Sequence, residues 1–285
     1  MDKTIAFLEL KYGHIYGSSQ WQKVVNEAAI LIHDPKSDRI RIYTKIFRTD
    51  LQLVLSYGIT NDLGITVGRE FEVVDLMNGR KRPYDEEFLL RKSLKSRKAR
   101  EAGKIKAQLK QFLIGVMKYH NLEALITYGG SRDISICQHC GVRFNRIPLM
   151  EDTQRLLQKY TKHLFSLNMA AKIVDFEYQG GYINSNNCEF KLHPRTAALM
   201  KPNSATFDVA RAFLVHQEFT NHQQNMIIKA ALQMQKVQEA TKEMAEDAEE
   251  NEGVDDTVEE TTIEVDTDVT EPVIETETDD TVPAD

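Results

Sequence analysis

The chain has 285 residues, more than the roughly 100–200 residues of a typical single domain, so we expect one large domain with an appendage. No apolar run reaches the ~18 residues of a membrane-spanning helix, and the N-terminus lacks the basic-then-apolar order of a signal peptide, which argues against a membrane partner. Three cysteines are too few for a disulfide framework in a chain of this length, which favours a cytoplasmic protein.

The net charge of −7 averages two regions of opposite sign. Residues 243–285 contain 19 Asp and Glu and no Lys or Arg, which leaves residues 1–242 with a charge of +12. A basic body joined to an acidic tail is typical of nucleic-acid-associated proteins, although a solubilising tail on an ordinary domain gives the same pattern.

Three apolar, β-rich runs open the chain at 4–10, 24–34 and 39–47, and a turn-rich DPKSD segment links the last two. We expect them to form a three-stranded antiparallel meander. The next stretch, 51–77, is less regular and is predicted to be mostly short elements and loop.

A helical pattern follows from 84 to about 119, where Gly103 is a candidate break between two helices. Residues 122–128 predict a buried strand, and Asp133 leads into a short helix that Gly141 is suited to cap. A further strand is expected at 144–150, followed by a helix that begins near Asp152.

The remaining third of the chain changes character twice. Residues 177–203 are rich in Gly, Asn and Pro and are expected to be irregular, whereas helical patterns cover 203–219 and continue to about 245. Beyond about 250, Thr, Val and acids alternate without aromatic residues, which predicts disorder.

These elements indicate an α/β fold, a mixed sheet flanked by helices. We expect a domain at 1–220 that contains a basic helical segment at 80–110, a helical extension at 221–249, and a disordered acidic tail at 250–285.

Five motifs follow one another along the first 220 residues: FLELK at 7–11, NEAAILI at 26–32, YGGSRDISI at 128–136, DTQRLL at 152–157 and NSATFDVA at 203–210. In order and register this set resembles the DnaQ-like (DEDD) 3′–5′ exonuclease superfamily. The resemblance implies an RNase H-like fold and a site in which four acids hold two divalent cations on the scissile phosphate, with a His as general base.

The functional residues of that family carry over only in part. Asp133 and Asp208 stand at the third and fourth acids, and Glu9 replaces the first Asp. Lys11 takes the place of the second acid, and Asn203 takes the place of the His, so neither can play the original role. An ammonium beside a divalent metal repels the ion, and Lys11 is instead expected to pair with Asp133 or Asp208. If activity survives, the resemblance implies that Glu9, Asp133 and Asp208 hold one Mg²⁺ or Mn²⁺; otherwise no cofactor is implied.

Segment 80–110 contains twelve Lys and Arg against four acids. It is a candidate surface for single-stranded DNA or RNA, with a merely solvated helix face as the alternative. The candidate nucleic-acid-binding residues are Arg91, Lys92, Lys95, Arg97, Lys98, Arg100, Lys104 and Lys106. The acidic tail is suited to compete with nucleic acid for this face, to recruit a basic protein partner, or to keep the chain soluble.

Cys137 and Cys140 form a C-x-x-C motif, with Cys188 and His193 as conceivable further zinc ligands. The pair falls on the short helix after Asp133, where one turn places both sulfurs on the same side. This placement favours buried packing over a metal site.

Together these features predict a divergent, nucleic-acid-binding member of the DnaQ-like superfamily that is weak or inactive as a nuclease. The alternatives are an active metal-dependent 3′–5′ exonuclease and a non-catalytic interaction subunit of a nucleic-acid-processing complex.

Overall fold

The structure, a computed structural model, describes residues 4–17, 23–37, 39–84 and 96–251. Residues up to Thr241 form one compact unit, and a second unit begins at Lys242. The structure describes the second unit only to Asn251, where helix α7 ends. The expected disordered tail therefore lies almost entirely outside the described residues.

One sheet, with eight strands among the described residues, forms the centre of the first unit. Strands β1 (Ile5–Ile15), β2 (Lys23–Asp34) and β3 (Arg39–Ile46) pair antiparallel, which confirms the expected meander. Strand β1 also pairs in parallel with β7 (Ala124–Thr127), and β7 pairs in parallel with β8 (Leu149–Asp152). The strand order in this part is β3-β2-β1-β7-β8, with helices on both faces, so the α/β class is confirmed.

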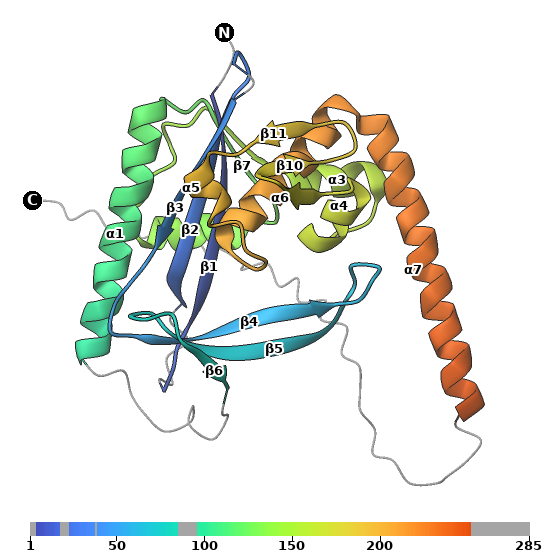
Figure 1. The fold of residues 1–285 in the computed structure, drawn as a ribbon, viewed down its shortest axis with the longest axis horizontal. Coiled ribbons are helices and arrows are strands. Elements are labelled where there is room, and N and C mark those ends of the chain that lie inside the picture. Colours follow the sequence, from blue (N-terminus) through green and yellow to red (C-terminus); the bar gives the residue numbers. More distant parts are fainter. Residues whose placement is uncertain (1–3, 18–22, 38, 85–95, 252–285) are drawn as a thin grey trace, which may run out of the picture. The chain divides into compact units, whose positions relative to one another are not determined.

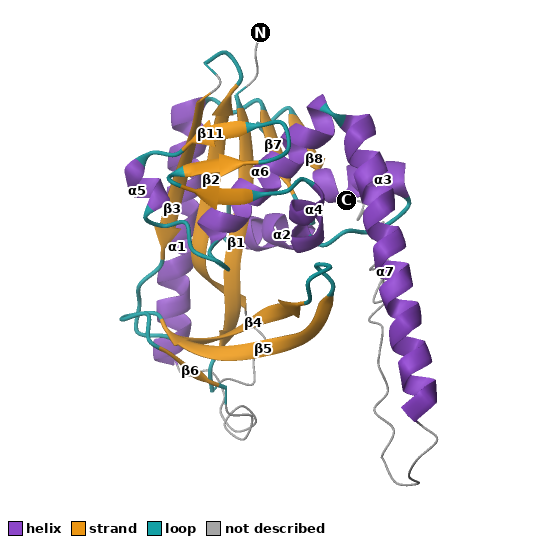
Figure 2. Ribbon diagram, turned by 45° about the vertical axis from the view of Figure 1, so that its right-hand side comes forward, coloured by secondary structure: helices purple, strands orange, loops and turns teal. Residues whose placement is uncertain are grey.

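The far end of β1 pairs antiparallel with a second group of strands, β4 (Gln52–Thr60), β5 (Thr66–Asp75) and β6 (Lys81–Pro83). Figure 2 shows β4 and β5 as a long, curved pair below the rest of the sheet. The expectation of mostly loop at 51–77 was wrong. Half of the residues of β5 are exposed and only Val73 and Val74 are buried, so its sequence lacks the alternation of apolar and polar residues that marks a half-buried strand.

Helix α1 (Ser96–His120) covers one face of the sheet (Figure 1). Its apolar residues recur with helical spacing and pack on Leu8 and Leu10 of β1: Ala102, Ile105, Leu109, Leu113 and Val116. The expected break at Gly103 does not occur, because Gly103 lies on the exposed side of the helix while Ala102 and Ile105 are buried in the core. The ~1 kcal/mol that Gly costs in a helix is offset by this burial.

Helix α6 (Ala205–Asn221) covers the opposite face and packs on Phe7, Ala29 and Leu31 through a nearly continuous buried surface. It begins where Ser204 accepts a hydrogen bond from the N–H of Phe207 at 3.1 Å. The helical pattern toward residue 245 is interrupted at His222, so α7 (Gln223–Asn251) is a separate helix. Met226 and Ala230 of α7 pack with α4 (Leu167–Ile173).

The smaller elements match the expectations unevenly. Helix α2 (Ser131–His139) ends near Gly141, whose φ of +80° suits the left-handed position after a helix. Helix α3 (Thr153–Thr161) begins at Asp152, which accepts from the N–H of Gln154 at 3.0 Å, as expected. The strand expected at 144–150 begins only at Leu149.

The stretch 177–203 is more ordered than expected. It holds a small three-stranded sheet of β9 (Glu177–Gln179), β10 (Tyr182–Asn184) and β11 (Glu189–Lys191), followed by α5 (Pro194–Ala197). Ile183 and Phe190 are buried against α6, so two apolar side chains anchor a sequence whose composition otherwise indicates loop.

Candidate functional site

Strand β1 points Phe7, Glu9 and Lys11 toward the face covered by α6, because alternate residues of a strand share one side. Phe7 lies in the apolar cluster with α6, and Glu9 and Lys11 continue the same row. The register between β1 and β2 shifts between Lys11 and Tyr12, directly beyond the pair Lys11–Glu27. Such irregularities locally re-aim side chains and occur often beside functional sites.

Helix α6 brings Asp208 to this row, 197 residues away in sequence. The Lys11 ammonium forms an ion pair and hydrogen bond with Oδ2 of Asp208. Only 25% of the Lys11 side chain and 14% of the Asp208 side chain are exposed, so water screens the pair weakly.

Arg211, one turn further along α6, approaches the other oxygen of Asp208. Its Nη1 lies 3.4 Å from Asp208 Oδ1 and donates to Oδ1 of Asn168 at 2.7 Å. The guanidinium also lies over the ring of Phe207, 5.1 Å from the centroid. Asp208 is therefore held by a cation on each of its two carboxylate oxygens.

Asp133 enters the site from α2 and is nearly buried, with 8% of its surface exposed. Its Oδ2 accepts a hydrogen bond from the backbone N–H of Leu10 at 3.1 Å, which ties α2 to β1. Burial raises the pKa of Asp133 to about 7, against the lowering effect of that hydrogen bond and of Lys11.

Glu9 lies near enough to Asp133 and Asp208 for their charges to affect its protonation. Burial, and then the negative charges of Asp133 and Asp208, raise the pKa of Glu9 well above its ordinary value, while Lys11 lowers it. The raised pKa values of Glu9 and Asp133 both favour the protonated carboxyl over the carboxylate.

Lys11 keeps its charge in this setting. Burial acts to lower its pKa, but Asp208, Glu9 and Glu27 together outweigh burial and raise it. Glu27 also accepts from Thr206 Oγ1 at 3.3 Å, at the first turn of α6. One ammonium thus lies among the carboxylates of Glu9, Glu27 and Asp208.

This donor set does not fit a pair of divalent cations. Asp208 has both oxygens engaged by cations, and the Lys11 ammonium brings positive charge to the point where the acids gather. Within the part of the chain that the structure describes, no three His, Cys, Asp or Glu side chains are arranged to hold a metal ion.

Asn203 lies outside this cluster. It is exposed in the turn before α6, with a φ of +64°, and no side-chain hydrogen bond joins it to a described residue. The structure thus brings Glu9, Lys11, Asp133 and Asp208 together, but not Asn203.

Two participants, Glu27 and Arg211, were missed in the sequence. Arg211 follows Asp208 by three residues, a spacing that places both on the same side of a helix. Glu27 lies in the NEAAILI motif, next to Lys11 across the two strands. Both signals are readable only once the positions of Lys11 and Asp208 are known.

The candidate nucleic-acid-binding residues divide into three groups. Arg91, Lys92 and Lys95 lie outside the described residues. Arg97 pairs with Asp50, Lys98 donates to the carbonyl of Tyr16, and Lys104 pairs with Glu101. Arg100 and Lys106 form no ion pair with any acid that the structure describes.

None of the three cysteines forms a disulfide. Cys137 is buried in the core on the α1 face, where burial raises the pKa of its thiol above the normal range, and Cys140 packs against the same core. His193 instead accepts from the N–H of Arg195 as the N-cap of α5. The C-x-x-C pair lies in apolar packing, as the sequence favoured.

Neither a protein-family model nor a curated protein matches the chain. Among the described residues, no helix has both the length and the apolar character needed to cross a bilayer.

Proposed function

We propose that the chain is a nucleic-acid-binding protein of the DnaQ-like 3′–5′ exonuclease type, with an RNase H-like domain and weak or absent nuclease activity. The strand order β3-β2-β1-β7-β8 supports the fold, because three antiparallel strands followed by two parallel ones suit that architecture. The convergence of Glu9, Asp133 and Asp208 from β1, α2 and α6 supports the proposed ancestry.

The ion pair between Lys11 and Asp208 is the main observation in support of weak or absent nuclease activity. Two-metal hydrolysis needs a strongly negative cluster, whereas this one contains the charges of Lys11 and Arg211 and a proton favoured on Glu9 or Asp133. Asn203 at the position of the general base cannot take a proton from water near neutral pH.

Binding of nucleic acid rests on charge. Residues 1–242 carry +12, and α1 presents Arg100 and Lys106 without acidic partners among the described residues. Cations of this kind bind phosphates without regard to sequence and lose affinity as salt rises. A cytoplasmic location is part of this proposal, because the three cysteines form no disulfide.

Trimming of a 3′-labelled single strand, DNA or RNA, in the presence of Mn²⁺ tests this proposal. We expect the wild-type protein to bind the strand without shortening it, and Lys11→Glu to gain Mn²⁺-dependent trimming. Lys159→Glu, the same charge change at an exposed position on α3, is the matched control.

Trimming by the wild-type protein that disappears in Asp208→Ala would overturn the weak or absent activity and favour an active exonuclease. Absence of binding to either strand, even at low salt, would overturn the nucleic-acid function and favour a protein-interaction role. Circular dichroism of each variant separates loss of function from loss of fold.

A further inference from the structure

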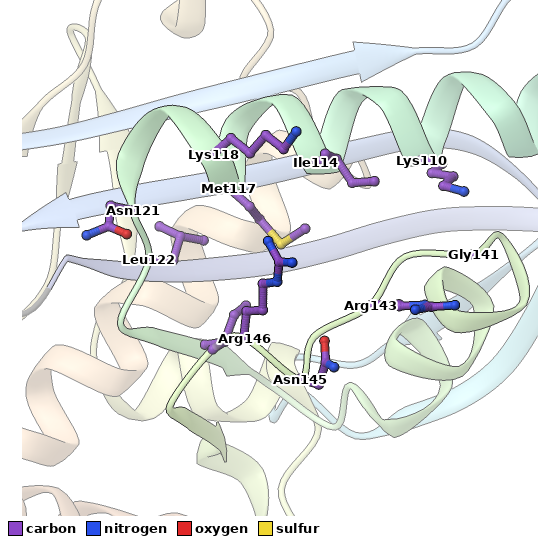
Figure 3. A pocket seen from close by; sticks show the side chains of 11 residues that line it. Lys110, Ile114, Met117, Lys118, Asn121, Leu122, Gly141, Arg143, Asn145 and Arg146 are labelled. Carbon is purple, nitrogen blue, oxygen red and sulfur yellow. The ribbon is translucent and has the colours of Figure 1, made fainter.

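A groove of about 670 Å³ lies between the C-terminal half of α1 and the segment that follows α2. Figure 3 shows Lys110, Ile114, Met117 and Lys118 along the helix, and Arg143, Asn145 and Arg146 facing them from the loop. Its volume is within the ~300–1,000 Å³ of typical small-molecule sites. The groove belongs to the α1 face of the sheet, whereas Lys11 and Asp208 lie on the α6 face.

Four cations and no carboxylate line this groove: Lys110, Lys118, Arg143 and Arg146. All four are exposed, and none pairs with an acid among the residues that the structure describes. This differs from Arg97 and Lys104 earlier on α1, which have acidic partners. Unpaired Lys and Arg converging on one groove are suited to phosphate groups, because each forms charge-assisted hydrogen bonds with phosphate oxygens.

The wall of the groove is apolar. Ile114, Met117, Leu122 and Ile147 line it, and Met117 and Ile147 pack against the core behind. In Figure 3 the Met117 side chain points from α1 into the space near Arg146. Flexible, polarisable Met side chains make favourable contacts with aromatic rings, so this wall suits a planar ring.

Two amides, Asn121 and Asn145, complete the lining. Each offers both a donor and an acceptor, the combination needed to pair with the polar edge of a nucleobase. Inorganic polyphosphate would leave the apolar wall and both amides unused, and a purely apolar ligand would leave four cations without partners.

We propose that this groove binds a nucleotide, with its phosphates on the Lys and Arg side chains and its base against Ile114 and Met117. The nucleotide is either free or part of a single strand. This site goes beyond the proposed function, because it does not depend on whether the Lys11 cluster hydrolyses or binds anything.

Fluorescence anisotropy of a labelled adenosine triphosphate, titrated with the full chain at low salt, tests the proposal. Unlabelled ATP should compete about tenfold or more better than inorganic tripolyphosphate, because the base adds its own contacts. Arg146→Glu should weaken binding about tenfold or more through loss of a charge-assisted contact. Met117→Gln, which keeps the length of the side chain, should reduce the advantage of ATP over tripolyphosphate. Lys159→Glu should bind as the wild type.

Two outcomes would overturn the proposal: equal competition by ATP and tripolyphosphate, or equal binding by wild type and Arg146→Glu. A further arm distinguishes the two sources of nucleotide. A short single strand that displaces the labelled ATP at least about tenfold better than unlabelled ATP would assign the groove to a strand, provided that an abasic strand of equal length competes at least about tenfold less well than the intact strand. Equal competition by the abasic strand would also refute a nucleotide site.

Discussion

The Lys11 cluster and the groove beside α1 both gather charged side chains but arrange them in opposite ways. The Lys11 cluster consists of Glu9, Lys11, Glu27, Asp133, Asp208 and Arg211. In the Lys11 cluster, Lys11 and Arg211 each contact Asp208, and all three side chains are largely shielded from water. In the groove, Lys110, Lys118, Arg143 and Arg146 are exposed and have no acidic partner among the described residues.

This difference in pairing and exposure suggests different roles, with the cluster important for stability and the groove for binding. A shielded charge must be compensated inside the protein, so the Lys11 cluster contributes to holding β1 against α6. An exposed, unpaired charge costs little in the folded state and remains available to an external anion. We therefore expect substitutions in the cluster to change the free energy of unfolding, and substitutions in the groove to change binding alone.

The largest expected effect comes from Lys11→Met, which leaves Asp208, Glu9 and Glu27 facing one another with less compensation. Removal of one partner from a largely buried ion pair costs about 3 kcal/mol, and urea unfolding monitored by circular dichroism measures this loss. Lys104→Met, which removes a Lys side chain that is 57% exposed from its ion pair with Glu101, is the matched control and should leave the unfolding midpoint nearly unchanged. Similar losses of stability in Lys11→Met and Lys104→Met would show that the shielded Lys11 pair contributes no more than a pair with an exposed Lys.

The second effect is the gain in stability that Asp133→Asn should show over the wild type at alkaline pH. The pKa of Asp133 is raised from 3.8 in the unfolded chain to about 7 in the fold, so the folded state binds an extra proton between these values. Stability contributed by this group is present below about pH 4 and is lost as the pH rises through 7. Asp133→Asn removes the titration and keeps an acceptor for the Leu10 N–H.

We expect Asp133→Asn to match the wild type near pH 4 and to be more stable than the wild type near pH 8, as measured by urea unfolding at each pH. A variant whose difference from the wild type does not change with pH would show that the buried carboxyl does not titrate in this range.

Arg211→Met should have a smaller effect. It removes the hydrogen bond to Asn168 and the second cation on Asp208, but leaves the ion pair with Lys11 intact. A loss of roughly 1–2 kcal/mol in the free energy of unfolding is expected. A loss as large as that of Lys11→Met would mean that the guanidinium, rather than the ammonium, compensates Asp208.

The smallest effect on stability is expected from Arg146→Glu in the groove. Because Arg146 is exposed and unpaired with any described acid, its replacement should change the free energy of unfolding by less than about 0.5 kcal/mol. Thermal unfolding of wild type and variant checks this. A clear loss of stability in Arg146→Glu would show that the groove cations stabilise the fold, as the charges of the Lys11 cluster do.

Local patterns were enough to predict much of the fold. The apolar runs at 4–10, 24–34 and 39–47 gave the meander, and Asp152 marked the start of α3. The β4–β5 pair was missed because only two of the ten residues of β5 are buried, so burial imposes no alternation on its sequence.

The candidate site was predictable only as a list of residues. Glu9 and Lys11 share a face because they are two residues apart, but Asp208 is 197 residues from Lys11, and only tertiary packing brings them together. The groove left no local signal at all, since Lys110 and Arg146 lie on separate elements and each looks like an ordinary surface cation.

The central claim is that the Lys11–Asp208 ion pair occupies the place of a metal. Calorimetric titration of the wild-type protein with Mn²⁺, beside Asp208→Ala and Lys11→Glu, tests it most directly. We expect wild type and Asp208→Ala to give the same weak heat on addition of Mn²⁺, and Lys11→Glu to gain a binding event. Tight Mn²⁺ binding by the wild type that is lost in Asp208→Ala would contradict it.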